Sequence, residues 1–415
     1  MPWEDHFTKH LIAESHNVPT FLDKAKALTP GGSQTSSRRH GKVGTIDYPA
    51  FAVEAAGAYI YFSKTDRAID LAGANATCPL GANHPRVLEA VLSQLGKGGT
   101  MSLPAELEVS VSEQMLNVVP FNDRMVRWVR TGSEGMSAAV AIALQATGRA
   151  RVGVRVGSYH GWHTWTRDIC TPMSESALPE RRLLETLAAY CIESPRWTEV
   201  DAKYKRWVAS IRKLCDETGT LLIFDDVVHA FRFESGGLQQ SSGVPADLAV
   251  FSKALGNGIP VACVVGKKDL MQQTEYRVSS TFGGETLGLA AAGAVLQLHQ
   301  TQDVCGQLRQ VGVDLRERLL DAIDGTGIRL VGCPQHFRFE ADTDTPDTPL
   351  DDRFLTACIY DSQHPVLVHR DANNVNLAMD EYVRENIAAT IKRAAHNLES
   401  EVFRSHERGS DYEGG

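Results

Sequence analysis

Apolar and polar positions in the middle of the chain follow two patterns: short continuous apolar runs, and longer stretches with helical spacing. The short runs predict buried strands, and the longer stretches predict helices between them. Strands are predicted at 124–130, 152–157, 221–228, 248–255 and 261–266, and helices at 133–147 and within 200–217. This alternation is typical of an α/β fold in which helices cover both faces of a mainly parallel sheet.

The two ends of the chain have different patterns. Residues 2–28 predict one or two amphipathic helices that begin an N-terminal arm. After about residue 285, two long helices lead into short strands and a closing helix, which predicts a smaller α+β domain, and the last residues are polar and end in glycine. We expect four parts: an arm with part of the small domain at 1–60, a large domain at 61–290, a C-terminal small domain at 291–403, and a disordered tail at 404–415.

Composition narrows the classes of function. The 415 residues carry a net charge of −9, which argues against general binding to nucleic acid or to an anionic membrane. The eight cysteines form no CxxC pair, as is usual in a reducing compartment. The N-terminal segment carries charges throughout, and no run approaches the ~20 apolar residues of a membrane span. We therefore expect a cytoplasmic protein with no membrane or nucleic-acid partner.

Two of the predicted strands end in residues that could hold an anion and a flat ring. Ligands of parallel α/β sheets bind beyond the carboxyl ends of the strands. Gly132 and Ser133 lie between a strand and a helix, where backbone N–H groups can bind a phosphate or where the turn only caps the helix. Tyr159 follows the next strand and would stack on a flat ligand or simply pack. The nearby His160 and His163 lack a third ligand at helical spacing, so no metal site is expected.

Two further strand ends supply a carboxylate and an amine. Asp225 and Asp226 end the apolar run 221–224, and Lys253 follows the run 248–251. Burying either kind of charge is costly unless it is paired, neutral or used covalently. One ligand would use an anion cradle, an aromatic plate, a carboxylate and an amine together. That ligand is pyridoxal phosphate, through its phosphate, ring, ring nitrogen and aldehyde.

The motifs and their order also resemble a known family. In chain order they read TGSEGMSAA, YHGWH, FDDVVHAFR, FSKALGNGIP and STFGGETLG. Over roughly residues 28–400 the chain resembles the class III (ω-type) aminotransferases, which have the type I fold of pyridoxal-phosphate-dependent transferases. Within that family, PGGSQTSSRR is similar to the N-terminal motif of glutamate-1-semialdehyde aminomutase and related enzymes.

The resemblance implies a role for each matching residue. Lys253 would form the internal aldimine and then act as the base, and Asp225 would pair with the pyridinium nitrogen. Tyr159 would stack on one face of the ring and Val227 would pack on the other. These are roles that the family assigns to its matching positions.

The phosphate contacts carry a further implication. Gly132 and Ser133 would hold the phosphate of their own subunit, and Thr281 would reach the phosphate of the neighbouring subunit. The resemblance thus implies a homodimer with a shared active site.

Several positions depart from the family pattern around the expected substrate pocket. Asp226 replaces a glutamate, residues 229–232 and 283–286 differ from the usual motifs, and the segment 168–193 is short. Arg38, which matches the arginine of the N-terminal motif, is a candidate to bind a substrate carboxylate or else a solvated loop arginine. His229 and Glu285 are further candidate substrate contacts. The departures leave the substrate open.

The expected activity is amine transfer between a small-molecule amino donor and a keto or aldehyde acceptor. An intramolecular 2,1-aminomutase shares the early steps, and a decarboxylase or racemase would use the same cofactor. A non-catalytic scaffold that only binds pyridoxal phosphate is a further alternative. The presence of both Lys253 and Asp225 argues against that last alternative.

Overall fold

A computed structural model of the protein describes residues 18–39, 51–174, 177–273, 278–342, 350 and 352–410. The chain divides into two compact units. The first comprises Met1–Asn75, Leu80–Ala82 and Gln310–Gly415, and the second comprises Ala76–Pro79 and Asn83–Arg309. These limits differ from the predicted limits at residues 60 and 290, because the strands of residues 54–70 group with the first unit and the helix that follows residue 285 groups with the second.

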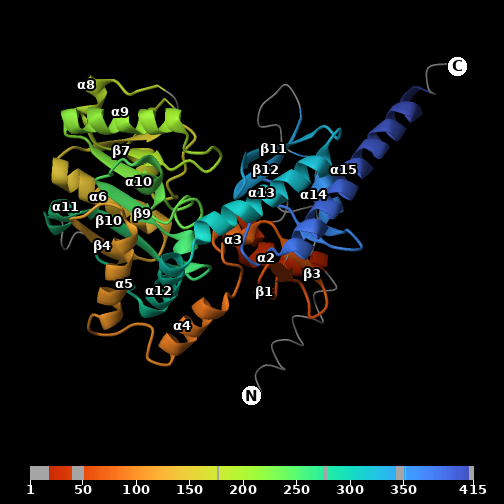
Figure 1. The fold of residues 1–415 in the computed structure, drawn as a ribbon, viewed down its shortest axis with the longest axis horizontal. Coiled ribbons are helices and arrows are strands. Elements are labelled where there is room, and N and C mark those ends of the chain that lie inside the picture. Colours follow the sequence, from red (N-terminus) through yellow and green to blue (C-terminus); the bar gives the residue numbers. More distant parts are fainter. Residues whose placement is uncertain are drawn as a thin grey trace. The chain divides into compact units, whose positions relative to one another are not determined.

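The second unit is built on a seven-stranded sheet with the order β4-β10-β9-β8-β7-β5-β6. Figure 1 labels β4, β10, β9 and β7 of this sheet. From β9 to β6 neighbouring strands run parallel, whereas β10 pairs antiparallel with both β4 and β9. The expectation of a mainly parallel sheet is confirmed. The strands are β4 Arg124–Val129, β5 Arg151–Arg155, β6 Cys170–Met173, β7 Leu187–Glu193, β8 Leu221–Asp225, β9 Leu248–Phe251 and β10 Ala262–Lys267.

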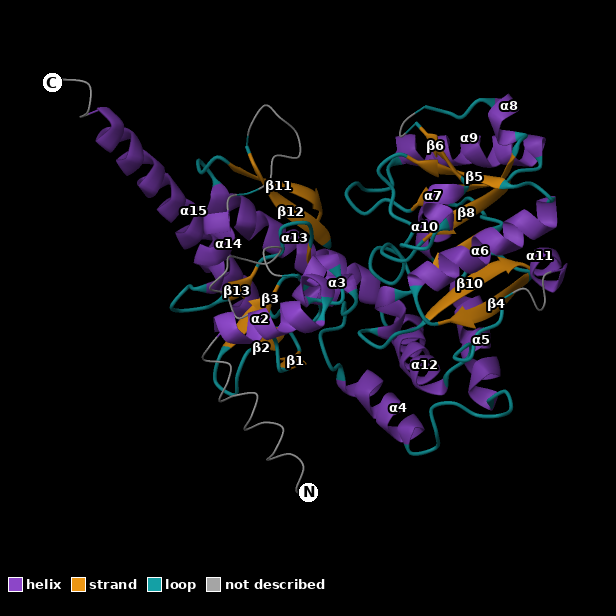
Figure 2. Ribbon diagram, turned by 180° about the vertical axis from the view of Figure 1, so that it is seen from behind, coloured by secondary structure: helices purple, strands orange, loops and turns teal. Residues whose placement is uncertain are grey.

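Helices cover this sheet, and one of the helices of the unit, α4 Pro85–Leu95, packs against the helix α12 Thr286–Thr301 (Figure 2). The other helices are α5 Glu106–Val118, α6 Gly132–Thr147, α7 Trp165–Asp168, α8 Arg181–Leu184, α9 Ala202–Thr218, α10 Gly237–Ser242 and α11 Lys268–Gln273, and α13 Val304–Ile323 crosses into the first unit. A short 3-10 helix, η3 Lys253–Gly256, follows β9. The predicted helices at 133–147 and within 200–217 correspond to α6 and α9.

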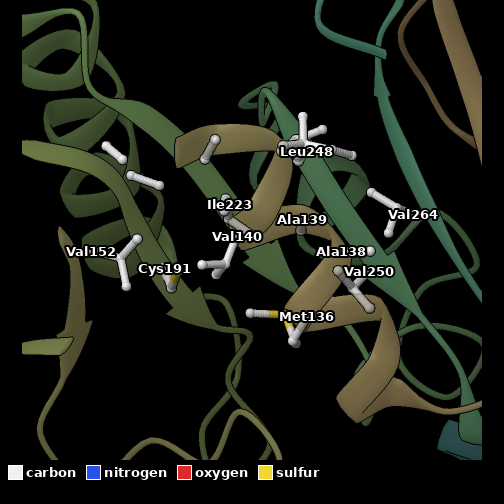
Figure 3. Packing of buried hydrophobic residues seen from close by; sticks show 14 of the residues in the cluster. Met136, Ala138, Ala139, Val140, Val152, Cys191, Ile223, Leu248, Val250 and Val264 are labelled. Carbon is white, nitrogen blue, oxygen red and sulfur yellow. The ribbon is translucent and has the colours of Figure 1, made fainter. Parts of the chain in front are cut away.

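The core of the second unit lies between α6 and one face of the sheet (Figure 3). Met136 and Val140 of the helix belong to one buried cluster with Ile223 and Val250 of the strands. Phe224 alternates with Ile223 and therefore points to the opposite face, yet it is also fully buried. A sheet buried on both faces explains the continuous apolar runs in the sequence.

The first unit contains two small sheets. One has the order β1-β2-β3-β13, and the other has the order β11-β12-β14. Its strands are β1 Glu54–Ala56, β2 Tyr59–Tyr61, β3 Arg67–Asp70, β11 Ile328–Cys333, β12 His336–Ala341, β13 Val366–Leu367 and β14 Asn373–Asn374. Its helices are α2 Val18–Leu28, η1 Pro30–Gly32, η2 Ser36–Arg38, α14 Asp352–Ile359 and α15 Glu381–Ser410, and α3 Gly73–Ala76 ends at the boundary between the units. The mixture agrees with an α+β composition.

The C-terminal segment differs from the expectation. Residues 404–410 continue α15 and are not a disordered tail, and residues 411–415 lie outside the described part. The physical reason is visible in the sequence, because no proline or glycine interrupts the helix before Gly409. The predicted N-terminal helices are described only from Val18 onward. Within the described ranges, no helix has the length and apolarity needed to cross a bilayer.

Candidate active site

The register of the parallel strands brings the candidate carboxylates to one edge of the sheet. Glu193 ends β7 and pairs with Asp225, which ends β8. Asp225 in turn pairs with Val250 of β9, three residues before Lys253. The carboxyl ends of parallel neighbours meet at one edge, where ligands of such sheets bind. Asp225 and the end of the strand that leads to Lys253 therefore lie at one edge of the sheet, and the catalytic roles of both residues remain predictions.

Lys253 is partly buried and begins the short helix η3. Its φ of 46° lies in the left-handed region, which is uncommon for a residue with a side chain and occurs often at functional sites. Burial and, to a smaller extent, the charge of Arg196 lower the pKa of its amine to about 8, against the opposing charge of Asp225. An amine with this pKa is partly neutral near pH ~7 to 8 and can act as a nucleophile.

Asp225 is 5% exposed and is held by two contacts. Its Oδ2 lies 2.8 Å from Nδ1 of His160, and its Oδ1 accepts a hydrogen bond of 3.2 Å from the backbone N–H of Val227. Nε2 of His160 is buried and has no partner among the described residues. His160 therefore orients the carboxylate, a role that the sequence did not assign to it.

The predicted phosphate cradle lies at the start of α6. Thr131 caps the helix by accepting a 3.2 Å hydrogen bond from the N–H of Glu134. The N–H groups of a helix's first turn have no acceptor within the helix, so Gly132 and Ser133 present donors suited to an anion. This geometry fits the predicted role of both residues.

Two glycines pack the separate motifs against each other. A Cβ on Gly132 would lie 2.8 Å from Cγ2 of Val227, and one on Gly161 would lie 2.5 Å from Oγ of Ser133. Both distances are too short for ordinary contacts, so both positions require glycine. The close packing places Val227 beside the cradle, and Gly161 ties the YHG segment to the same helix start.

Tyr159 has an accessible side chain and an anchored backbone. Its side chain is 59% exposed, and its N–H donates a 2.9 Å hydrogen bond to Oε2 of Glu193. Burial raises the pKa of Glu193, and the charge of Arg196 opposes that shift. The other oxygen of Glu193 lies 3.4 Å from Nε of Arg196. Arg196 thus belongs to the site, and only its position three residues beyond a strand end could have indicated this.

The remaining predicted residues have different surroundings. His229 is buried, and its ring nitrogens lie 2.8 Å from the carbonyl of Pro195 and 2.9 Å from Oγ of Ser241. Burial lowers the pKa of His229 to about 4. A neutral ring with both nitrogens engaged is typical of a packing role, so these contacts weigh against a substrate contact.

Glu285 and Thr281 lie in the segment before α12. Glu285 caps that helix by accepting hydrogen bonds from the N–H groups of Leu287 and Gly288, at 2.9 and 3.0 Å, and it forms an ion pair with Arg130. These contacts assign Glu285 a structural role that its sequence position did not suggest. Thr281 is exposed.

Arg38 lies in η2 of the first unit and is exposed. Its Nε donates a 3.0 Å hydrogen bond to Oγ1 of Thr35. Its proposed contact with substrate remains a prediction. In the described parts of the chain, no cluster of three or more His, Cys, Asp or Glu residues could hold a metal ion.

Comparison with known proteins identifies the family. The family model of the class III aminotransferases matches residues 41–180 and 185–332, which is more than half of the chain. The chain belongs to this family. As a class III aminotransferase it is a pyridoxal-phosphate-dependent enzyme, and the resemblance drawn from its motifs is confirmed.

Proteins similar to this class III aminotransferase have several different names. The glutamate-1-semialdehyde 2,1-aminomutase of Acetivibrio thermocellus is 29% identical over 332 residues, which cover 72% of this chain and 77% of the relative. The FumI protein of Sphingopyxis sp. MTA144 has a TM-score of 0.82 at 22% identity, covering 93% and 97% of the two chains. An ω-transaminase from Sphaerobacter thermophilus has a TM-score of 0.78 at 21% identity, covering 91% and 97%. The two structures establish the type I fold.

The residues at the sheet edge fit pyridoxal phosphate. The donor set has an amine of lowered pKa in Lys253, an oriented carboxylate in Asp225, and the N–H groups of Gly132 and Ser133 in the first turn of α6, which have no acceptor within the helix. Gly132 also leaves room for close approach beside Val227. These groups would hold the aldehyde carbon, the ring nitrogen and the phosphate, respectively.

Proposed function

We propose that this chain catalyses amine transfer between a small-molecule amino donor and a keto or aldehyde acceptor, with Lys253 and Asp225 as catalytic residues. One observation carries the proposal. The amine of Lys253, the carboxylate of Asp225 and the start of α6 occupy one edge of the sheet in a class III aminotransferase. The assignment of the individual residues is part of the proposal.

Each residue has a task that follows from its surroundings. Pyridoxal phosphate, when bound, supplies an electron sink for the electron pair released at the substrate's amino-bearing carbon. Lys253, with its lowered pKa, binds the cofactor and then moves a proton at that carbon. Asp225 keeps a proton on the ring nitrogen, and His160 fixes the orientation of Asp225. Tyr159 and Val227 would hold the two faces of the ring.

An intramolecular aminomutase is the second candidate function. It is supported by relatives at 29% identity that are named glutamate-1-semialdehyde 2,1-aminomutase. The same residues serve both reactions, because the difference is only whether the amino group leaves the molecule it came from. Net amine transfer from one compound to a second would support the transaminase, and rearrangement within one compound would support the aminomutase.

The first test is spectroscopic. Purified protein supplied with pyridoxal phosphate should absorb near the visible edge, and Lys253→Ala should lose this band of lysine-bound cofactor. Lys268→Ala is the matched control, because Lys268 is exposed at the start of α11 and should leave the band intact. Absence of the band in the wild type, or its survival in Lys253→Ala, would contradict the proposal. A panel of amino donors followed by a keto acid then tests whether the band bleaches and recovers.

The proposal includes a homodimer with a shared active site. Leu88, Leu92 and Leu95 of α4 are spaced along one side of the helix and are 42%, 58% and 56% exposed. An apolar row of this kind supports a protein interface. Thr281 is exposed in the same unit, where a neighbouring subunit's phosphate could reach it.

The mass in solution tests the dimer. Light scattering should give twice the chain mass for the wild type, and Leu92→Glu should give a monomer with weaker cofactor binding. Leu178→Glu is the matched control, because Leu178 is 49% exposed on a different segment and should remain dimeric. A monomeric wild type would refute this part of the proposal without affecting the assignment of Lys253.

A cytoplasmic location completes the proposal. No disulfide bond joins any of the eight cysteines, all of which lie in the described ranges, and all except Cys170 are buried. Free thiols of this kind support a reducing compartment. Fractionation of cells that express the tagged protein tests the location, and recovery outside the cytoplasm would contradict it.

A further inference from the structure

The segment that carries Arg196 is fixed by neighbouring elements. Ser194 donates its N–H to the carbonyl of Asp225 at 3.0 Å and its Oγ to Oδ1 of Asp226 at 2.6 Å. The carbonyl of Pro195 lies 2.8 Å from Nδ1 of His229. The backbone immediately before Arg196 is therefore held at the edge of the sheet where Lys253 lies, and Arg196 emerges from a fixed position.

The guanidinium of Arg196 is incompletely paired. Its ion pair, with Glu193, runs through Nε at 3.4 Å, which is longer than the 2.7–2.9 Å typical of a charge-assisted hydrogen bond. By contrast, Arg212 in the same unit meets two carboxylates at 2.7 Å. Arg196 has a looser environment. Its guanidinium carbon lies 5.5 Å from the centroid of the Trp197 ring, and its side chain is 26% exposed. Within the described part of the chain, neither Nη group of Arg196 has a hydrogen-bond or ion-pair partner. The fork that binds carboxylates through two parallel hydrogen bonds is thus available.

Arg196 also lies close enough to Lys253 for their charges to interact. Its charge depresses the pKa of Lys253 more than that of Arg232 does. Arg232 is fully buried and donates from Nη2 to the carbonyl of Ala76 at 2.8 Å, so it is not accessible to a substrate. Of these two cations beside the reactive amine, Arg196 is the one that a substrate can reach.

From this geometry we infer that Arg196 binds a carboxylate of the amino substrate, so that the enzyme takes carboxylate-bearing amines in preference to simple amines. The inference rests on the proposed amine transfer and adds its substrate class. Glu193 stays on the N–H of Tyr159 and steadies Nε, while the two Nη groups bind the carboxylate oxygens. Arg38, suggested by the N-terminal motif, is the rival anchor.

Paired donors that differ only in the carboxylate test the inference. Suitable pairs are β-alanine with ethylamine and 4-aminobutyrate with propylamine. Arg196→Met should raise KM for the carboxylated donors on the order of 10- to 100-fold and change the simple amines little. Arg196→Lys keeps the charge but loses the fork and should fall between them. Arg206→Met is the matched control, because Arg206 is exposed on α9 and should match the wild type.

A binding measurement separates substrate recognition from turnover. Calorimetric titration of the cofactor-loaded protein with succinate should give a dissociation constant that rises by a similar factor in Arg196→Met and not in Arg206→Met. If Arg196→Met raised KM equally for both members of each donor pair, Arg196 would have a structural role and the inference would be overturned. Unchanged constants in Arg196→Met, or a wild type that does not prefer carboxylated donors, would also overturn it. A wild type that transfers no amine at all would instead refute the proposed function.

Discussion

Asp226 offers a direct test of the electrostatics beneath the site. It follows Asp225 and is completely buried. Ser194 and the N–H of Leu238 both donate to its Oδ1, at 2.6 and 2.8 Å, whereas its Oδ2 has no partner within the described residues. Burial raises the pKa of Asp226 from 3.8 to about 7, although those two hydrogen bonds oppose the shift. Asp226→Asn keeps the shape and removes the titration.

The sign of the pH effect follows from the direction of the pKa shift. A carboxyl group with a raised pKa holds its proton more tightly in the folded state, so the free energy of unfolding falls as pH rises from 3.8 to about 7 and is then flat. Each pH unit in that window costs about 1.4 kcal/mol. Between about pH 5 and about pH 8, Asp226 therefore costs the wild type roughly 3 kcal/mol, and Asp226→Asn escapes this loss.

Calorimetric melting of the cofactor-free protein measures this effect. The Tm difference between Asp226→Asn and the wild type should move in favour of the variant by about 3 °C from about pH 5 to about pH 8, the shift expected for roughly 3 kcal/mol in a chain of 415 residues. Asp247→Asn is the matched control, because Asp247 is buried but ion-paired with Arg212 and Lys267, and its pKa is lowered. The stabilisation that ionised Asp247 gives the wild type is lost only as pH falls toward and below 3.8. The Tm of Asp247→Asn should therefore lie below that of the wild type by the same amount from about pH 5 to about pH 8. A pH-independent difference for Asp226→Asn would refute the reasoning.

Two further predictions concern the cofactor site. Gly132→Ala should weaken cofactor binding and lower the free energy of unfolding by about 1–3 kcal/mol, because its Cβ would lie 2.8 Å from Val227. The control Gly96→Ala places its Cβ at an ordinary contact distance of 3.6 Å and should be nearly neutral. Equal cofactor affinities of the two variants in a fluorescence titration would contradict this prediction. The rate at which cofactor-free protein binds pyridoxal phosphate should rise with pH through about 8, because Lys253 loses its proton there. Arg196→Met removes a positive charge and should move this pH profile to higher pH. An unchanged profile in the variant would show that Arg196 does not affect the pKa of the amine.

The fold could be predicted where burial dominates the sequence pattern. β8 and β9 are continuous apolar runs because both faces of the large sheet are covered. The strands β1–β3 escaped prediction because they are short and largely part-exposed, and β3 pairs with β13 almost 300 residues away. The edge strand β6 contains Pro172, which hides its strand pattern.

Some residues of the candidate site could be predicted from the sequence and others could not. Lys253 and Asp225 could be predicted because costly groups at strand ends need a chemical reason. The contact of His160 with Asp225, and the buried bonds of His229, depend on how loops fold back across the sheet. Spacing alone does not determine those directions, so the different surroundings of His160 and His229 could not be predicted. Arg196 was missed for the same reason.

The charges around Lys253 suggest how substrate binding and proton transfer are linked. Arg196 and Arg232 lower the pKa of the amine, and Asp225 and Glu193 oppose them. Both carboxylates already have protein partners, so a carboxylate that arrives on Arg196 adds a new negative charge near the amine. That charge offsets the effect of Arg196 and raises the basicity of Lys253 when it must take a proton. The acidic limb of the profile of kcat against pH should therefore lie at higher pH for carboxylated donors than for simple amines. If the two limbs coincide, binding of the carboxylate at Arg196 does not change the basicity of Lys253.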